Sequence, residues 1–238
     1  LEVIAPSYRP DLGLEIDLIE EIARLAGYHA IPATMPRMRM APLKRNPGLE
    51  LASRLRERMA ALGFNEVLHT NFEDPRRLAI MRFDENDPRQ KAVRLANPLS
   101  ENESLLRTSL LPKLLAALVM NRSRGDSGMI RIYEINAVFE RTGPAAALQR
   151  TMLSGLISPE QEKALWGNSA ADPFYELKGV VEQILGLSRF PGFRLETGPS
   201  PQPHLHPGKQ ARVMAGAAEA GTLGDLHPRI GRELEIKG

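Results

Sequence analysis

Four acidic residues near the start of the chain have the types and the spacing of a possible cation site. Asp11 stands six residues before Asp17, and Glu20 and Glu21 follow Asp17 by three and four residues. Side chains at these last two spacings are neighbours on one face of a helix. Crowded carboxylates repel one another, so either a cation or an arginine partner would relieve them. Oxygen-only ligand sets suit Mg²⁺ or Ca²⁺, although Mg²⁺ normally takes only one or two carboxylates and keeps several waters.

The same residues also fit the start of an ordinary helix. Asp17 is a suitable N-cap residue, and Glu20 stands where its capping-box partner belongs. Acids near a helix N-terminus are also stabilised by the macrodipole. The apolar stripe of this helix would consist of Leu18, Ile19, Ile22, Leu25 and Ala26, and Gly27 would end it. From spacing alone, this simpler interpretation is favoured over a metal site.

A second group of candidate ligands follows much later in the chain. His204, His206 and Lys209 surround a Pro-Gly turn, and His227 precedes another proline. Two histidines separated by one residue in a loop are a weak metal signal unless a third ligand joins them. A polar turn that leads into a strand explains these residues more simply, and we favour that interpretation.

The segment RIYEI carries two charged residues, Arg131 and Glu134, on a predicted strand. An arginine at this place could hold a phosphate. Because successive side chains of a strand alternate between its faces, Arg131 and Glu134 must point in opposite directions. We expect one of them at the sheet surface and the other buried near Asn136.

No catalytic constellation is visible in the sequence. It contains no G-x-S-x-G motif, no P-loop and no G-x-G-x-x-G fingerprint. The single tryptophan, Trp166, fits a packing role better than a base-stacking role. Because the chain has no cysteine, disulfides, zinc–thiolate sites, iron–sulfur clusters and a cysteine nucleophile are excluded.

The composition is that of a globular protein. Of 238 residues, 42% are hydrophobic and 25% are charged. No apolar run approaches the ~18 residues that a membrane span needs, and there is no signal peptide, so the cytoplasm is the expected location. Without an initiator Met, the chain is expected to be a piece of a longer protein. Residues 1–30 hold six acids and two bases, whereas residues 31–60 hold seven bases and two acids.

Hydrophobic periodicity predicts the elements that position these residues. Helices are expected at residues 17–26, 49–62, from 108 or 109 to 124, and 172–187, each with an apolar stripe. Strands are expected at residues 64–72, 130–141 and 151–158, with a hairpin over residues 210–228. Residues 37–48 are rich in proline and arginine and are predicted to be a linker. Helices separated by meandering strands indicate an α+β fold with an antiparallel sheet.

Taken together, these segments resemble the beta subunit of bacterial phenylalanyl-tRNA synthetase, a class II aminoacyl-tRNA synthetase. The resemblance runs over essentially the whole chain, and the order and spacing of its pieces make it specific. The pieces are PSYRPDLGLEIDLIEEIARLAGYHAIP, GFNEVLHTNF, NPLSENESLLRTSLLPKLLAALVMN, RIYEINAVFER, FYELKGVVEQIL, HPGKQARV and GTLGDLHP.

The resemblance implies an architecture. Residues 1–36 would be the C-terminal part of a small winged-helix-like domain, and residues 49–238 a catalytically inactive, C-terminally truncated class II synthetase-like core. Its antiparallel sheet would be flanked by helices. The helix at 49–62 and the strand at 64–72 resemble the first class II motif, which packs at subunit interfaces.

The resemblance also implies a function. Catalysis in the family belongs to the alpha subunit, and an α₂β₂ tetramer joins phenylalanine to tRNA(Phe) using ATP and Mg²⁺. The chain would therefore be a noncatalytic assembly component that is inactive alone and able to self-associate. Acids at the spacing of Asp11, Asp17, Glu20 and Glu21 bind a Mg²⁺ shared with the alpha subunit in the family, and this implication reverses the preference for a simple helix start.

Two departures and two alternatives remain open. Asn136 stands where the family usually has Gly, and Lys209-Gln210 stands where Arg-Ser is usual. The first alternative function is a freestanding nucleic-acid-binding module, because residues 31–60 are basic. The second, less favoured, is a Mg²⁺-dependent hydrolase, which lacks an identifiable base and a second metal cluster.

Overall fold

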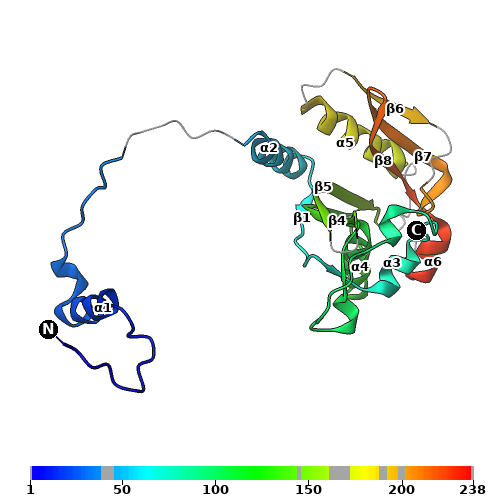
Figure 1. The fold of residues 1–238 in the computed structure, drawn as a ribbon. Helices are drawn as coiled ribbons and strands as arrows, with labels where there is room; N and C mark the ends of the chain where they lie inside the picture. Colours follow the sequence, from blue (N-terminus) through cyan, green and yellow to red (C-terminus); the bar gives the residue numbers. More distant parts are fainter. Residues whose placement is uncertain are drawn as a thin grey trace. The chain divides into compact units, whose positions relative to one another are not determined.

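The computed structural model describes residues 2–38, 46–143, 146–160, 172–187, 192–197 and 202–236. The chain divides into two compact units, residues 1–44 and 45–238, each with its own elements (Figure 1). Trp166 and most of the predicted linker lie outside the described residues. The predicted domain limits, 1–36, 37–48 and 49–238, stay a prediction.

The described part of the first unit contains the helix α1 (Glu15–Ala26) and the single turn η1 (Tyr28–Ala30). α1 ends at Gly27, as predicted, with φ of 93° and an N–H that donates to the carbonyl of Ala23. None of residues 2–38 is buried. The apolar stripe is uncovered, since Ile22 and Leu25 are 65% and 78% exposed. The described residues of this unit therefore form no hydrophobic core of their own.

The second unit holds the other elements of the described ranges. Its helices are α2 (Pro47–Ala61), α3 (Pro75–Ile80), α4 (Leu111–Ser123), α5 (Pro173–Leu187) and α6 (Pro228–Glu233), with the short turns η2 (Pro88–Gln90) and η3 (Glu101–Glu103). Its strands are β1 (Asn65–Glu66), β2 (Phe72–Glu73), β3 (Leu105–Leu106), β4 (Ile130–Arg141), β5 (Ala147–Ser158), β6 (Phe193–Thr197), β7 (Leu205–Ala215) and β8 (Ala218–Leu226).

β4 is the centre of the main sheet, whose order is β1-β4-β5. β4 and β5 pair antiparallel over their full length, from Ile130 opposite Ser158 to Arg141 opposite Ala147. β1 adds two residues in parallel to β4, so this sheet is not purely antiparallel. Gly155 lies opposite Tyr133, where an added Cβ would stand 3.1 Å from the Ile132 carbonyl oxygen. The predicted strand at 130–141 is confirmed, and that at 151–158 is the second part of β5.

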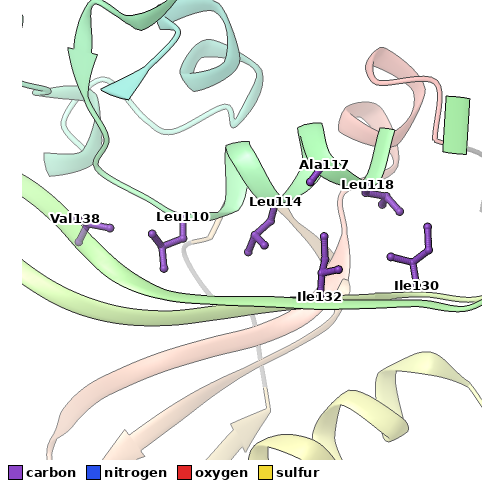
Figure 2. Close-up of a cluster of buried hydrophobic side chains, with 7 residues drawn as sticks. All are labelled: Leu110, Leu114, Ala117, Leu118, Ile130, Ile132 and Val138. Atoms are coloured by element: carbon purple, nitrogen blue, oxygen red, sulfur yellow. The ribbon is translucent and has the colours of Figure 1, made fainter. Parts of the chain in front are cut away.

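The alternation of β4 divides the core into two layers. One face packs against α4, in a cluster of Leu110, Leu114, Ala117, Leu118, Ile130, Ile132 and Val138 (Figure 2). The other face packs against α2 and α5, in a cluster of Met59, Phe64, Tyr133, Ile135 and Val180. Each such fully buried aliphatic side chain contributes about 1.5–3 kcal/mol of transfer free energy. The two layers fix which way each polar residue of β4 points.

A second antiparallel sheet, β6-β7-β8, lies beside α5 (Figure 1). Its buried residues Ala211, Val213 and Leu223 pack against Phe174, Leu177, Val181 and Leu185 of α5. α5 thus lies between the two sheets and contributes to both cores. The hairpin predicted over residues 210–228 is confirmed by β7 and β8, which turn at Gly216 with φ of 62°.

Two predicted elements differ from the structure for a local reason. The strand predicted at 64–72 is wrong as a continuous element, since only its ends pair, in β1 and β2. Between them, His69 donates its N–H to the carboxylate of Glu134 instead of to a strand. The helix predicted from 108 or 109 begins at Leu111, because Thr108 donates its hydroxyl to the carbonyl of Arg89.

Candidate functional site

Two of the four predicted metal ligands are held by arginines. Nη2 of Arg9 lies 2.7 Å from Oδ2 of Asp11 and 2.7 Å from Oε1 of Glu21, so one guanidinium bridges both carboxylates. Nη2 of Arg24 lies 2.6 Å from the other oxygen of Glu21. Hydrogen bonds from Arg9 lower the pKa of Asp11, and those from Arg9 and Arg24 lower the pKa of Glu21. The repulsion is relieved by arginine, one of the two alternatives that the sequence left open.

The other two predicted ligands differ from each other. Oδ2 of Asp17 accepts hydrogen bonds from the backbone N–H groups of Gly13, at 2.9 Å, and Leu14, at 2.7 Å. Because α1 begins at Glu15 with Leu14 as N-cap, the prediction that Asp17 is the N-cap is wrong. Asp17 caps from inside the helix, since its carboxylate satisfies N–H groups that the helix itself leaves unpaired. Glu20 is exposed and has no hydrogen bond or ion pair within the described ranges.

As arranged, these carboxylates do not fit a bound Mg²⁺. Among the residues that the structure describes, no three His, Asp or Glu side chains gather as a metal-binding group. Carboxylates are suitable donors for Mg²⁺, but the guanidinium of Arg9 lies where a cation would contact both Asp11 and Glu21. A bound ion would have to displace it. The metal prediction for Asp11, Asp17, Glu20 and Glu21 stays a prediction.

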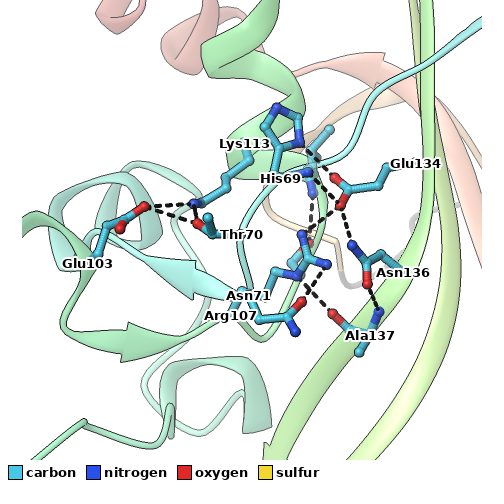
Figure 3. A network of polar contacts seen from close by, with 11 residues as sticks. His69, Thr70, Asn71, Glu103, Arg107, Lys113, Glu134, Asn136 and Ala137 are labelled. Atoms are coloured by element: carbon cyan, nitrogen blue, oxygen red, sulfur yellow. Dashed lines mark hydrogen bonds and ion pairs between the residues drawn. The ribbon is translucent and has the colours of Figure 1, made fainter. Parts of the chain in front are cut away.

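A second charge group lies at the centre of the main sheet (Figure 3). The side chains of Arg107 and Glu134 are 0% exposed, and Nη1 of Arg107 lies 2.8 Å from Oε1 of Glu134. Arg107 also donates from Nε to the carbonyl of Ala137, at 2.8 Å, and from Nη2 to Oδ1 of Asn71, at 2.9 Å. Glu134, Ala137 and Asn71 thus hold the guanidinium of Arg107 against the middle of β4.

Glu134 receives further donors on both oxygens. His69 donates its backbone N–H to Oε1 at 3.2 Å, and its Nδ1 lies 2.7 Å from Oε2. Asn136 donates from Nδ2 to Oε1 at 2.9 Å. Burial alone would raise the pKa of Glu134, but the hydrogen bonds from His69, Arg107 and Asn136 outweigh it, so the pKa is lowered. The divergent Asn136 thus takes part in holding this carboxylate ionised.

Beside this network lies a second buried cation. Lys113 of α4 donates from Nζ to Oγ1 of Thr70, at 2.6 Å, and lies 3.3 Å from Oε1 of Glu103 (Figure 3). Glu73 is 1% exposed, and its Oε2 has no partner among the described residues. Burial raises the pKa of Glu73. Nη1 of Arg77 lies 3.8 Å from the other oxygen of Glu73.

Arg131 lies on the opposite face of β4 from Glu134, as the alternation predicted. Its guanidinium pairs closely with Glu176 of α5 and donates to the carbonyl of Leu62, at 3.2 Å. Glu134 is the buried member of the pair, next to Asn136, which confirms that expectation. Because Arg131 is engaged within the protein, it is not available for a phosphate.

The histidines of the second group act as packing and turn residues. His204 is 7% exposed, contacts the ring of Phe83 edge-on at 5.5 Å between centroids, and has no partner for Nδ1 in the described ranges. Burial, followed by the charge of Arg89, lowers its pKa to about 4. Nδ1 of His206 accepts from the N–H of Gly208 at 3.0 Å. These contacts agree with the favoured polar-turn interpretation.

Lys209, the cationic member of that group, pairs with carboxylates. Its Nζ lies 2.8 Å from Oδ2 of Asp172, just before α5, and 3.4 Å from Oδ2 of Asp225 on β8. The pair with Asp172 joins β7 to the start of α5. The divergent Lys209 therefore has a structural contact, and Gln210 is buried beside it at 6% exposure.

Sequence reasoning missed the residues that surround Glu134. Arg107 stands in the apolar run LLRTSLL, and an arginine between leucines just before a helix was the signal that could have identified it. His69 and Asn71 carried no such signal, because they fall in a polar segment that was expected to be a strand. Their partners lie 65 and 36 residues away along the chain.

Two protein-family models match this chain. The model of the phenylalanyl tRNA synthetase beta chain CLM domain matches residues 31–238, and that of the tRNA synthetase B5 domain matches residues 1–28. The phenylalanine--tRNA ligase beta subunit of Syntrophus aciditrophicus is 37% identical over 98% of this chain, and that of Syntrophotalea carbinolica is 38% identical over 99%. This chain spans about 29% of the length of both relatives.

A solved structure of a pyrrolysyl tRNA synthetase from Desulfitobacterium hafniense has a similar fold. Its TM-score is 0.57 and its identity is 21%, over 93% of this chain and 67% of that one. At this identity, the likeness speaks for the class II fold alone. In the described residues, no helix combines the length and the apolar character that crossing a membrane requires.

The two family models together cover nearly the whole chain, in the order that the sequence segments had indicated. The chain belongs to the phenylalanyl-tRNA synthetase beta chain family of class II aminoacyl-tRNA synthetase subunits.

Proposed function

We propose that this chain is a noncatalytic portion of a phenylalanine--tRNA ligase beta subunit. It would assemble with the catalytic alpha subunit in an α₂β₂ enzyme of the cytoplasm that attaches phenylalanine to tRNA(Phe) with ATP. The observation that supports it best is the network around Glu134. Arg107 and Glu134 are wholly buried and bonded to the protein's own groups. A sheet centre closed in this way offers no free charged group to a substrate.

The proposed assembly surface includes the N-terminal end of α2. Leu55 and Met59 of α2 turn inward to the core that contains Tyr133. Leu49 and Leu51, on the same helix, are 71% and 41% exposed. Apolar side chains that remain exposed at one end of a helix whose later turns already pack into the core mark a surface for a further partner.

Co-expression with the cognate alpha subunit tests this proposal. We expect the wild-type chain to co-purify with the alpha subunit. A variant with Leu49→Glu and Leu51→Glu should no longer co-purify, although its melting temperature should be unchanged. Leu99, which is 100% exposed, supplies the matched control Leu99→Glu. If neither the wild type nor the control co-purifies, the assembly proposal is wrong. If all three co-purify equally, α2 is not the assembly surface.

Mg²⁺ enters this proposal only through the family. The ligands would be Asp11, Asp17, Glu20 and Glu21, and an ion shared with the alpha subunit would replace Arg9 between Asp11 and Glu21. Glu20→Gln is the clean probe, because Glu20 has no contact within the described ranges. Manganese-induced broadening of the α1 amide NMR signals, weakened by Glu20→Gln, is the expected result. Equal broadening in the Glu20→Gln variant and the wild type, or no broadening in the assembled complex, would contradict the proposed Mg²⁺ site.

The freestanding nucleic-acid-binding module is the second candidate. The basic stretch 31–60 suggested it, but Arg56 is paired with Glu66 at 2.8 Å and residues 39–45 lie outside the described ranges. Family models that cover residues 1–28 and 31–238 favour the ligase subunit over a freestanding module.

A further inference from the structure

Three exposed arginines of the second unit lack an acidic partner. In the described ranges, about half of the arginines form ion pairs with carboxylates, including Arg56, Arg76 and Arg150. Arg82, Arg229 and Arg232 form none within those ranges, where their guanidinium groups make one long hydrogen bond, from Arg232 to the Pro228 carbonyl at 3.4 Å. All three are exposed. Unpaired arginines are a notable feature only if they lie together.

The fold brings these arginines together. Arg82 follows α3 in the left-handed conformation, with φ of 58°, between the buried residues Met81 and Phe83. Met81 and Phe83 belong to the same core cluster as Ile230 of α6. Arg229 directly precedes Ile230 in α6. Arg232 follows Arg229 by three residues in the same helix. The anchors of Arg82 and of the α6 arginines therefore share one core.

The electrostatics of His227 agree with this placement of the three charges. His227 precedes α6, and its Nδ1 accepts the N–H of Arg229 at 3.1 Å. Its pKa is lowered first by burial, then by the charges of Arg82 and Arg229, and then by His206 and Arg232. All three arginines thus act on one half-buried imidazole. The carboxylates that stand near them in sequence are Asp84, Glu85, Asp225, Glu233 and Glu235, and none lies within ion-pair distance of these arginines.

The surroundings of the patch decide what kind of anion it suits. No large apolar side chain is exposed in residues 74–92 or 226–236. Protein interfaces normally contain an apolar core. An apolar hollow of this unit lies between α3, α4 and Leu234, but Arg82, Arg229 and Arg232 do not line it. Phe83 is buried, so the patch also presents no ring on which a base could stack. Forked guanidinium groups without apolar or aromatic company suit phosphates.

We propose that Arg82, Arg229 and Arg232 form a contact site for the phosphate backbone of an RNA. The site would position RNA without reading its sequence, because phosphate contacts carry no base information. The identification of the anion as RNA rests on the proposed function, whereas the convergence of the arginines does not. A bound phosphate would also favour the imidazolium form and raise the pKa of His227.

RNA binding by the full chain tests the proposal. The probe is a fluorescein-labelled RNA hairpin with a 12-base-pair stem, and its affinity is measured by anisotropy as a function of salt. The test variant carries Arg82→Gln, Arg229→Gln and Arg232→Gln. The matched control carries Arg58→Gln, Arg94→Gln and Arg124→Gln, which removes the same charge from three exposed arginines elsewhere. Circular dichroism melting checks that both variants fold.

We expect the slope of log affinity against log salt to become shallower by about 2.7 in the test variant, for three phosphate contacts, and to change little in the control. Addition of inorganic phosphate should raise the NMR-measured pKa of His227 in the wild type and the control variant, but not in the test variant. Equal losses in the two triple variants, no loss in the test variant, or displacement of the RNA by poly-glutamate at equal charge would overturn the proposal. Because the test variant should still co-purify with the alpha subunit, failure of this site and failure of assembly are distinguishable.

Discussion

Two of the groups in which an arginine bridges acidic or polar partners differ in burial. In the first unit, Arg9 joins Asp11 and Glu21, and the side chain of Arg9 is 33% exposed. In the second unit, Arg107 and Glu134 are 0% exposed. Ion pairs in water contribute little, whereas breaking a buried pair leaves an uncompensated charge. Spacing along the chain drew attention to the first group, but the second is the one on which the fold depends.

The largest effect should come from breaking the buried pair. Arg107→Met removes the main cationic partner of Glu134 and leaves three hydrogen-bond acceptors without their donor. We expect the free energy of unfolding to fall by about 3–5 kcal/mol. Urea unfolding followed by circular dichroism measures it. A double variant with Glu134→Leu should lose less than the single variant, and a loss below about 1 kcal/mol would show that the pair is not essential.

A pH titration probes a second buried group of the same unit. The pKa of His204 is about 4 in the folded chain against 6.5 ordinarily, so the unfolded chain takes up the proton first. Stability should be unaffected above pH 6.5 and fall by about 3 kcal/mol between pH 6.5 and pH 4. Unfolding free energies measured across this window check the slope. The His204→Gln variant should lack this component, and identical slopes in both chains would contradict the burial argument.

In the first unit, the cap is expected to matter more than the ion pairs. Asp17→Ala removes the acceptor of two backbone N–H groups and should destabilise α1 by about 0.5–2 kcal/mol. Asp17→Asn keeps an acceptor oxygen and should lose less. Amide hydrogen exchange of α1 measures the difference. Equal exchange rates in the wild type and Asp17→Ala would show that the cap is not formed.

The smallest effect should follow from Arg9→Gln. The pKa values of Asp11 and Glu21 are lowered chiefly by Arg9, so both should rise toward their ordinary values in the variant. Carboxyl NMR titration checks this, with Glu20 as an internal reference. The global unfolding free energy should barely change, in contrast to Arg107→Met. A large loss on Arg9→Gln would break the comparison between the two regions.

The long strands of the main sheet could be predicted from the sequence because their hydrophobic alternation is a local pattern. The period-two alternation of RIYEINAVFER predicted β4, its two faces and the burial of one of Arg131 and Glu134 near Asn136. The helix-ending glycines Gly27, Gly63 and Gly125 all have positive φ, as their positions after apolar stripes indicated. The segment at 64–72 was misread as one strand, because its pairing with β4 stops after Val67 and the N–H of His69 bonds to the side chain of Glu134 instead.

The sequence by itself determined the family, the main elements and the faces of the central strand, because these depend on local periodicity and on the order of matching segments. Only the tertiary structure decided which charged residues are buried and therefore contribute most to stability. Arg9 and Arg107 are the same residue type, yet one remains in water and the other is enclosed by groups up to 36 residues away. The convergence of Arg82 with Arg229 and Arg232 likewise needs two distant segments to share a core. Electrostatic strength depends on burial and on distances in space, which spacing along the chain does not encode.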